Sequence, residues 1–523
     1  MLSPSPSHYS SPRMTFPRSS GLLLHPTSFP GPYGIGDLGP EAYKFADFLH
    51  AAGQKIWQVL PLNPTGYADS PYQCFSAFAG NPLLLSLDSL IDQGLLQRSD
   101  LETIRTFPTD EVAYGRVIDW KYPVLRIAAR NFFTSSSQEL RSAFDDFCRD
   151  NASWLEDFTL FMAAKEAHGL VMWTLWDPAL ARRDPAAMES WRTKLADSIA
   201  AHKYWQFEFF RQWRALQKYC HDRDILIMGD IPIYVAHDSS DVWSRPDLFH
   251  LKPDGNPALV AGVPPDYFSA TGQLWGNPIY RWDLMRASGY TWWIERFRAA
   301  LTMFDMMRVD HFRGFEAYWE IPGGDLTAQR GKWVKGPGAE LFEAVTAALG
   351  PLPIVAENLG VITPEVEAIR HRFGYPGMAL MQFGYGTDPQ GPSFRPHNYV
   401  RDLVAYTGGH DNDTMVGWWT SGVADSTRSE DDLRREHQFV SEYFGFSLSD
   451  PSVEINWIFI RALYVSVAAT VLVPVQDVIG LGGRARMNLP GRPWGNWKWR
   501  LVEGQLTSEH QARLKEFTRV YDR

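Results

Sequence analysis

Eight short apolar segments alternate with amphipathic helical segments along this chain, and this order constrains the fold more than any other feature. A helical pattern at 39–53 lies between two such segments, and another opens with Thr363 and Pro364 and ends at Gly374. A βαβα order of this kind is typical of a parallel sheet covered by helices. We therefore predict an α/β protein with a (β/α)8 TIM barrel. The predicted strands are Leu22–Phe29, Ile56–Leu62, Ile225–Ile231, Met306–Asp310, Ile354–Glu357, Ala379–Phe383, Leu403–Thr407 and Thr470–Val475.

Two intervals are too long to be single crossovers between neighbouring strands. Residues 65–222 contain several helical patterns, among them Tyr204–Tyr219, and predict a mostly helical insertion. Residues 234–282 are rich in Pro, Gly, Asp and aromatic residues. Loops of that length are usually functional, so we predict long rim loops that cover a substrate. The remainder of 21–523 then forms a single barrel domain.

The N-terminal residues 1–20 are rich in Ser and Pro and contain no apolar core of a secretory signal. We expect a disordered tail here, although the absence of acidic residues leaves a short organelle transit segment open, and Met14 is an alternative start. The three cysteines, Cys74, Cys148 and Cys220, are far apart and form no CxxC. This excludes a disulfide scaffold and a cysteine-rich zinc site, favours a reducing compartment and predicts a cytoplasmic protein.

Composition narrows the class of partner. The chain has 60 acidic and 50 basic residues, a net charge of -10, and no basic patch, which argues against a nucleic acid partner. No segment approaches the roughly 18 consecutive apolar residues of a transmembrane helix, so we expect no membrane partner. The 21 Trp, 21 Tyr and 31 Phe offer flat apolar faces that match a sugar ring, although most are expected in the core. We expect a monomer or a weak homo-oligomer.

Three carboxylates, Asp310, Glu357 and Asp411, end predicted strands or follow them closely, at the rim where catalytic groups of a barrel converge. Strand alternation places Arg308 and Asp310 on one face, and the arginine favours an ionised, nucleophilic aspartate. The apolar residues before Glu357 predict a raised pKa, as a general acid requires. Two such carboxylates are what retaining glycoside chemistry needs.

Each of these residues also has a purely structural interpretation. Arg308 and Asp310 form a barrel salt bridge in that case, Glu357 caps a helix, and Asp411 belongs to an Asp/Asn-rich turn. A magnesium site built from rim acids and His311 is a further alternative, but the adjacent arginine would repel the ion. No metal motif of known spacing occurs, so we predict no metal.

Three further residues are candidates on the same rim. Asp230 is a fourth carboxylate at a strand end, His410 precedes Asp411 and is placed to donate to the same sugar, and Asn358 follows Glu357 and is expected to hydrogen-bond it. The glycines before His410 allow the backbone to approach a ligand closely.

A family resemblance covers almost the whole chain outside the helical insertion and the tail. The segments that carry it are RSSGLLLHPTSFPGPYGIGDLG, WQVLPLNPTGYADSPYQCFSAFAGNP, MGDIPIYVAHDSSDVW, GVPPDYFSATGQLWGNPIY, RVDHFRGF, AENLGVITPEV, GHDNDT and RMNLPG. In these segments the chain resembles the amylomaltases, the 4-α-glucanotransferases of glycoside hydrolase family 77 in the α-amylase superfamily. One departure is Gly409, where the family more usually has Thr.

The resemblance implies that Asp310 is the nucleophile, Glu357 the general acid/base and Asp411 the transition-state stabiliser, with no metal or organic cofactor. It also implies that Tyr267 and Phe268 lie in a loop that arches over the cleft. The complete set of expected substrate-binding residues is Ser70, Tyr72, Asp230, Tyr267, Phe268, Gln273, Trp275, Arg308, Asn358, His410 and Asn488.

The expected function is transfer of α-1,4-glucan segments to the 4-hydroxyl of glucose or a maltodextrin by a retaining double displacement. Two alternatives stay open. An α-amylase-like hydrolase uses the same carboxylates and differs only in its loops and acceptor site. A non-catalytic glycan-binding barrel belongs to a different class, although such a protein would not need all three rim acids.

Overall fold

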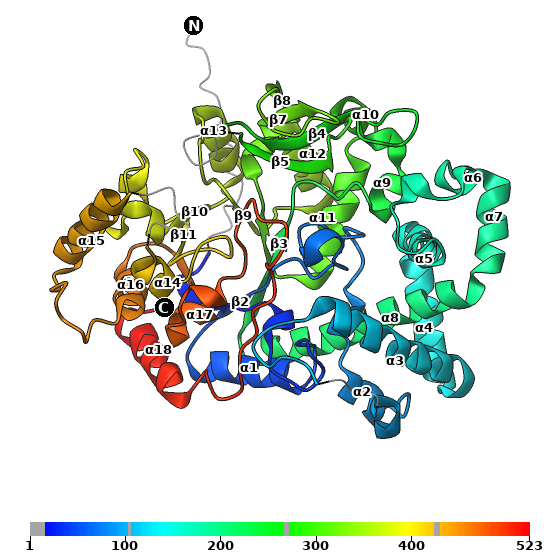
Figure 1. The fold of residues 1–523 in the computed structure, drawn as a ribbon, viewed down its shortest axis with the longest axis horizontal. Helices are drawn as coiled ribbons and strands as arrows, with labels where there is room; N and C mark the ends of the chain where they lie inside the picture. The colour runs from blue at the N-terminus through cyan, green and yellow to red at the C-terminus, as the bar shows by residue number, and fades with distance from the viewer. Residues whose placement is uncertain (1–15, 103–105, 266–270, 423–428) are drawn as a thin grey trace, which may run out of the picture.

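The computed structural model describes residues 16–102, 106–265, 271–422 and 429–523. Its centre is a sheet of eight strands in the order β10-β11-β12-β1-β2-β3-β6-β9 (Figure 1). Every hydrogen-bonded pair in this order is parallel. A hydrogen bond of 2.9 Å from Ala356 N to Pro376 O joins the two ends of the order, so the sheet is nearly closed. The predicted (β/α)8 barrel is confirmed.

All eight predicted barrel strands are present, with shifted ends. The bounds are β1 Ser19–Leu23, β2 Ile56–Gln58, β3 Leu226–Ile231, β6 Met306–Val309, β9 Ile354–Ala356, β10 Gly377–Leu380, β11 Leu403–Tyr406 and β12 Thr470–Pro474. The largest error is in the first strand, which the sequence placed at Leu22–Phe29. The tail predicted at 1–20 also extends too far, because β1 begins at Ser19 and Arg18 donates hydrogen bonds to the carbonyls of Ser466 and Tyr521.

The strands alternate between two cores. The barrel interior contains a compact cluster that includes Met228, Met306, Val355 and Leu472. The intervening residues, such as Val309, belong to the large cluster between strands and helices. Since side chains of successive strand residues point to opposite faces, this alternation brings every second residue to the barrel interior and its rim.

Helices cover the outside of the barrel, and their ends follow local sequence signals. α13 begins at Pro364 after the N-cap Thr363 and ends before Gly374, which has a left-handed conformation with φ 70°, as predicted. The helices outside the insertion are α1 Pro40–Ala51, α9 Ser240–Ser244, α10 Trp282–Ala287, α11 Thr291–Met303, α12 Ala339–Leu349, α13 Pro364–Phe373, α14 Met415–Thr420, α15 Glu430–Phe444, α16 Ile455–Val465, α17 Val475–Ile479 and α18 Ser508–Val520.

The region 65–222 is mainly helical, and Figure 1 shows α4, α5, α6 and α7 to one side of the barrel. The predicted helix Tyr204–Tyr219 is part of the longer α8, which leads directly into β3. Its buried Trp205 donates a hydrogen bond of 3.0 Å to the carbonyl of Leu125, which ties α8 to α3. The helices of this region are α2 Leu87–Asp92, α3 Tyr114–Ser135, α4 Gln138–Asp150, α5 Ala152–Ala167, α6 Pro178–Ala181, α7 Pro185–Lys194 and α8 Ala196–His221.

A second sheet, which the sequence did not predict, stands over one part of the barrel (Figure 1). It is antiparallel, and its strands are β5 Gln273–Pro278, β4 Leu259–Val263, β7 Ala317–Pro322 and β8 Lys332–Lys335, in that order. The interval 234–282 is therefore not simply a long loop, since it contains α9, β4 and β5. The sequence did not predict these strands, because glycine and proline interrupt them and because β7, which pairs with β4, is distant in sequence. In the part of the chain that the structure describes, no helix is long and apolar enough to span a bilayer.

Candidate active site

The register of β3 against β6 builds the centre of the site. Asp230 on β3 lies directly opposite Arg308 on β6. Arg308 Nη1 donates to Asp230 Oδ1 at 3.0 Å and Oδ2 at 2.9 Å, and it lies 2.8 Å from Asp310 Oδ1. Val309, between Arg308 and Asp310, is buried in the outer core, so the predicted placement of Arg308 and Asp310 on one face is confirmed. The Asp310 side chain is 28% exposed whereas that of Asp230 is fully buried, so only Asp310 is open to a ligand.

Burial and charge act on these groups together. Burial raises the pKa of Asp230, Arg308 opposes this and Asp310 adds to it. Burial disfavours the charge on Arg308, but the two aspartates together raise its pKa above its usual value. Arg308 is therefore a permanent cation between two carboxylates, one structural and one exposed to the site.

Glu357 lies beside this group because β9 pairs with β6. Val309 is paired with Ala356, so Asp310 and Glu357 are the next residues along two adjacent strands. Glu357 Oε2 accepts a hydrogen bond of 2.7 Å from His311 N, and Oε1 accepts one of 2.7 Å from Leu359 N. His311 adopts a left-handed conformation with φ 47°. This strained residue aims its amide at the carboxyl group.

The pKa of Glu357 is raised to about 7, chiefly by burial. Arg308 lowers this pKa and Asp310 raises it. The raised value agrees with the expectation from the apolar residues that precede Glu357. A carboxyl group of this kind holds its proton close to neutral pH and is able to donate it there.

Asn358 does not hydrogen-bond Glu357, contrary to the prediction. Its Oδ1 accepts from Met378 N at 2.8 Å and its Nδ2 donates to Glu367 at 2.9 Å. The physical reason is strand alternation, because neighbouring residues at a strand end point in opposite directions. Asn358 instead joins β9 to β10, where the barrel has no continuous ladder.

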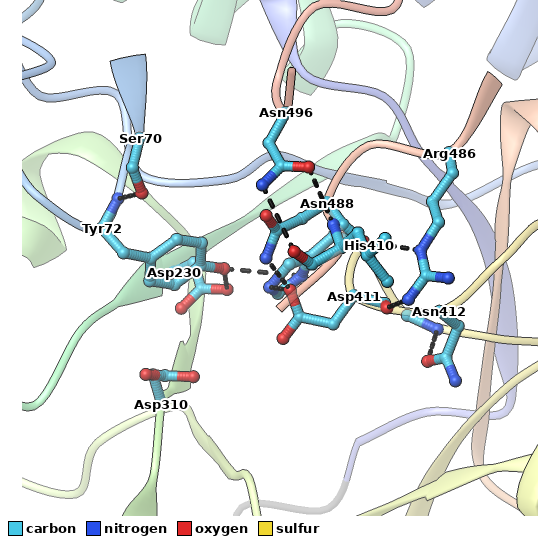
Figure 2. Close-up of polar contacts among 12 residues, drawn as sticks. Ser70, Tyr72, Asp230, Asp310, His410, Asp411, Asn412, Arg486, Asn488 and Asn496 are labelled. Carbon is cyan, nitrogen blue, oxygen red and sulfur yellow. Dashed lines mark hydrogen bonds and ion pairs between the residues drawn. The ribbon is translucent and has the colours of Figure 1, made fainter. Parts of the chain in front are cut away.

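Asp411 and His410 occupy the loop between β11 and α14. Asn488 Nδ2 donates to Asp411 Oδ1 at 2.6 Å, and Asn488 N donates to the carbonyl of His410 at 3.1 Å. His410 Nε2 lies 3.4 Å from Asp411 Oδ1, and Arg486 donates to the Asp411 carbonyl at 2.6 Å (Figure 2). The structure thus brings the predicted residues His410, Asp411 and Asn488 into one hydrogen-bonded group.

Tyr72 connects this loop to the buried aspartate. Its hydroxyl donates to Asp230 Oδ2 at 2.8 Å, and its ring stacks on that of His410 with centroids 5.0 Å apart (Figure 2). Ser70 Oγ accepts from Tyr72 N at 3.2 Å, in a turn where Ala68 and Asp69 both have φ 57°. Ser70 therefore supports the backbone turn that directs Tyr72 into the site.

Two predicted residues lie at the start of β5 and two lie outside the described residues. Trp275 Nε1 donates to Gln273 Oε1 at 3.1 Å, and the Trp275 ring meets that of His311 edge-on with centroids 4.8 Å apart. Trp275 thus packs against the residue that follows Asp310. Tyr267 and Phe268 are the two residues that fall outside the described residues.

Three site residues were missed by the sequence reasoning, all in the segment 486–497. Trp497 lies 5.7 Å from the ring of Tyr72 and 5.8 Å from that of His410. Asn496 Oδ1 accepts from Leu489 N at 3.0 Å and holds the turn that carries Asn488, while Arg486 binds the carbonyl of Asp411. The signal available for Asn496 and Trp497 was the run of Gly, Pro and Trp that follows RMNLPG, and Arg486 is the first residue of RMNLPG itself.

The arrangement does not resemble a metal site. Within the described ranges, no three His, Cys, Asp or Glu side chains are grouped so as to hold an ion. The position between Asp230 and Asp310 contains the guanidinium of Arg308.

Comparisons with known proteins show the family of the chain. A family model described as 4-alpha-glucanotransferase, glycoside hydrolase family 77, matches residues 24–506. The chain is 48% identical to a 4-alpha-glucanotransferase of Thermus thermophilus, over 98% of this chain and all of the relative. It is also 48% identical to one of Synechocystis sp., over 97% of this chain and 98% of the relative. The solved amylomaltase of Streptococcus agalactiae, in complex with acarbose, superposes with a TM-score of 0.91 at 40% identity, over 97% of this chain and 99% of that one.

Proposed function

The chain belongs to the 4-alpha-glucanotransferases of glycoside hydrolase family 77, and on this premise we propose that it works by a retaining double displacement on α-1,4-glucans. The observation that supports the mechanism best is the position of Asp310 and Glu357 at the ends of the paired strands β6 and β9. Adjacent strands lie about 4.8 Å apart. Retaining enzymes hold their two carboxyl groups about 5–5.5 Å apart.

In the first step, Asp310 attacks the anomeric carbon while Glu357 gives its proton to the departing glycosidic oxygen. A bond from the anomeric carbon to an Asp310 oxygen forms as the bond to the leaving sugar breaks. Arg308 Nη1 lies 2.8 Å from Asp310 Oδ1 and holds the carboxyl group that attacks. The pKa of Glu357 near 7 keeps a proton available for the leaving group.

In the second step, Glu357 acts as a base. It takes the proton of the 4-hydroxyl of glucose or of a maltodextrin, and that oxygen attacks the anomeric carbon and releases Asp310. One α-1,4 bond replaces another, so the net change in bond energy is small. A long glucan whose own end attacks closes into a ring.

Positive charge that develops on the sugar ring is stabilised by the loop of His410 and Asp411. Asn488 fixes one oxygen of Asp411, and the stacked ring of Tyr72 fixes the plane of His410. Groups that are held in place before the reaction stabilise a developing charge without the cost of reorganisation.

Transfer in place of hydrolysis requires that the acceptor outcompete water. Water is present at roughly 55 M, whereas well-oriented groups reach effective concentrations of about 10⁵–10⁸ M, so a bound acceptor wins when bulk water is kept out. Trp275, against the ring of His311, is one candidate for this role. Tyr267 and Phe268 are the other candidates.

Trp275→Ala should raise the release of reducing ends relative to disproportionation, and Trp275→Phe should not. Equal ratios of reducing ends to disproportionation in both variants would reject this role of Trp275.

Incubation with maltotriose tests the activity directly. Thin-layer chromatography should show glucose and a ladder of longer maltodextrins. Only shorter sugars would indicate a hydrolase, and unchanged maltotriose would indicate a binding protein. Asp310→Asn should abolish turnover in a folded protein, and activity above a few per cent of wild type would refute the nucleophile assignment.

We also propose that the enzyme acts in the cytoplasm in maltodextrin, starch or glycogen metabolism, as a monomer or weak homo-oligomer without a cofactor. Its three cysteines are free thiols, which fits a reducing compartment. Light scattering after size-exclusion chromatography tests the oligomeric state. Activity that survives dialysis against EDTA tests the independence from metal.

A further inference from the structure

One buried carboxylate holds both ends of the loop that carries His410 and Asp411. Thr407 Oγ1 donates to Asp477 Oδ2 at 2.5 Å, and Met415 N donates to Asp477 Oδ1 at 2.7 Å. Thr407 follows the last residue of β11, and Met415 is the first residue of α14. A single side chain, only 2% exposed, therefore joins the two ends of the loop.

Asp477 is itself fixed in place. It lies in α17, the short helix that directly follows β12. Its carbonyl accepts a hydrogen bond of 2.8 Å from Asn456 Nδ2 of α16. The carboxylate is thus anchored to the barrel wall and not to the loop that it holds.

Gln382 also supports the loop, because its Nε2 donates a hydrogen bond of 2.8 Å to the carbonyl of Asp413. A cavity of about 20 Å³ lies beneath the loop, lined by Gly408, Gly409, His410, Gln476 and Asp477, among others. A space of this size is comparable to one water molecule. Inside the loop, Asn412 Oδ1 accepts a hydrogen bond of 2.8 Å from Gly409 N, whereas the two ends are joined through Asp477.

The outer side of the loop is held separately. Asn488 and Arg486 contact His410 and Asp411, and these contacts fix the loop against the segment 486–497. They do not reach Thr407 and Met415, which Asp477 holds. The position of the Asp411 carboxylate is then set from two sides by two different elements.

We propose that Asp477 is a positioning residue, which places His410 and Asp411 for the transition state by holding Thr407 and Met415. The proposal rests on the proposed function, because it takes Asp411 as the group that stabilises the developing charge. The hydrogen bonds to Asp477 act through the loop and involve no contact with the sugar.

A pair of variants at Thr407 tests the hydroxyl without disturbing packing. Thr407→Val removes the donor and keeps the shape, and Thr407→Ser keeps the donor. We expect Thr407→Val to lower kcat for maltotriose disproportionation about tenfold or more with KM changed less than twofold, since small misplacements of catalytic groups cost up to about 10²-fold. Thr407→Ser should stay within about twofold of wild type, because it retains the group that matters.

Asp477→Ala removes both hydrogen bonds and should lower kcat further than Thr407→Val. Glu208→Gln is the matched control, because Glu208 is also a buried carboxylate with several donors but lies in α8, far along the chain from the loop. It should lower the melting temperature and leave kcat unchanged. Circular dichroism checks that each variant is folded, and the Thr407 pair decides the outcome where Asp477→Ala does not fold.

The proposal fails if Thr407→Val loses stability but keeps its kcat, or if the Val and Ser variants lose kcat equally. Asp411→Asn separates this failure from that of the proposed function. An inactive Asp411→Asn with a fully active Thr407→Val would overturn only the role of Asp477. A fully active Asp411→Asn would overturn the role of Asp411 itself.

Discussion

Replacement of Glu357 by Gln should change the pH dependence of stability in a defined direction. The raised pKa, about 7 against an ordinary 4.5, means that the folded protein binds a proton that the unfolded chain has lost. The contribution of Glu357 to the free energy of unfolding of the wild type therefore falls as pH rises from about 4.5 to about 7 and is level above that. At about 1.4 kcal/mol per pH unit, this change amounts to about 3 kcal/mol.

The glutamine variant has no such titration, so its stability relative to wild type should increase over the same range. An unfolding entropy of about 2 cal/mol/K per residue gives about 1 kcal/mol/K for a chain of 523 residues, so the expected change is about 3 °C in melting temperature. Melting curves of both proteins at pH 5 and pH 8 measure it. Gln also accepts only one of the two hydrogen bonds from His311 and Leu359, but this effect is constant with pH and cancels.

Glu343→Gln is a suitable control, because Glu343 pairs with Arg372 at an exposed surface. Surface pairs contribute about 1 kcal/mol or less, so the difference from wild type should stay constant between pH 5 and pH 8. A difference in melting temperature between wild type and Glu357→Gln that is the same at both pH values would refute the reasoning.

In wild type, the first step of catalysis should slow above pH 7 as Glu357 loses its proton.

Three further variants test separate contacts of the site. Tyr72→Phe removes the hydrogen bond to Asp230 and keeps the ring. Because a hydrogen bond to a charged group contributes about 1.5–3 kcal/mol, kcat/KM for maltotriose should fall about tenfold or more. An unchanged kcat/KM would show that the hydroxyl is dispensable. Arg308→Met leaves two carboxylates without their cation, and denaturant unfolding should show a loss of about 3–5 kcal/mol together with loss of turnover. Asn358→Ala opens the junction to Met378, and should cost about 1–3 kcal/mol of stability while kcat changes less than threefold. A loss of kcat without a loss of stability would instead favour contact between Asn358 and the substrate.

The sequence predicted the barrel because its strands are buried on both sides and each is preceded or followed by turn residues. It located Arg308 and Asp310 on one face for the same reason, since strand alternation is a property of the backbone. It could not locate the second sheet, where β4 pairs with β7 across more than fifty residues and with β5 around a register shift at Val260 and Gly262. Pairing of that kind depends on tertiary contacts and leaves little local pattern.

The same distinction between local pattern and tertiary contact applies to the residues of the site. A carboxylate at the end of an apolar strand is visible in the sequence, and so are the candidates Asp230 and Asp411. The partners that hold them are not, because Asn488 is 77 residues from Asp411 and Tyr72 is 158 residues from Asp230. Asp477 shows the same limit, since nothing near it in sequence indicates that its carboxylate reaches both Thr407 and Met415.

The balance of charge in the site explains why its carboxyl groups have different tasks. One guanidinium, Arg308, lies between Asp230 and Asp310 and contacts both, so two anions already surround one cation. Burial, the largest cause, keeps Glu357 protonated up to about pH 7; Arg308 opposes this and Asp310 adds to it. The positive charge that develops on the sugar in the transition state offsets the excess negative charge around it. A site with this balance of charge therefore favours the transition state over the ground state, which is the condition for catalysis.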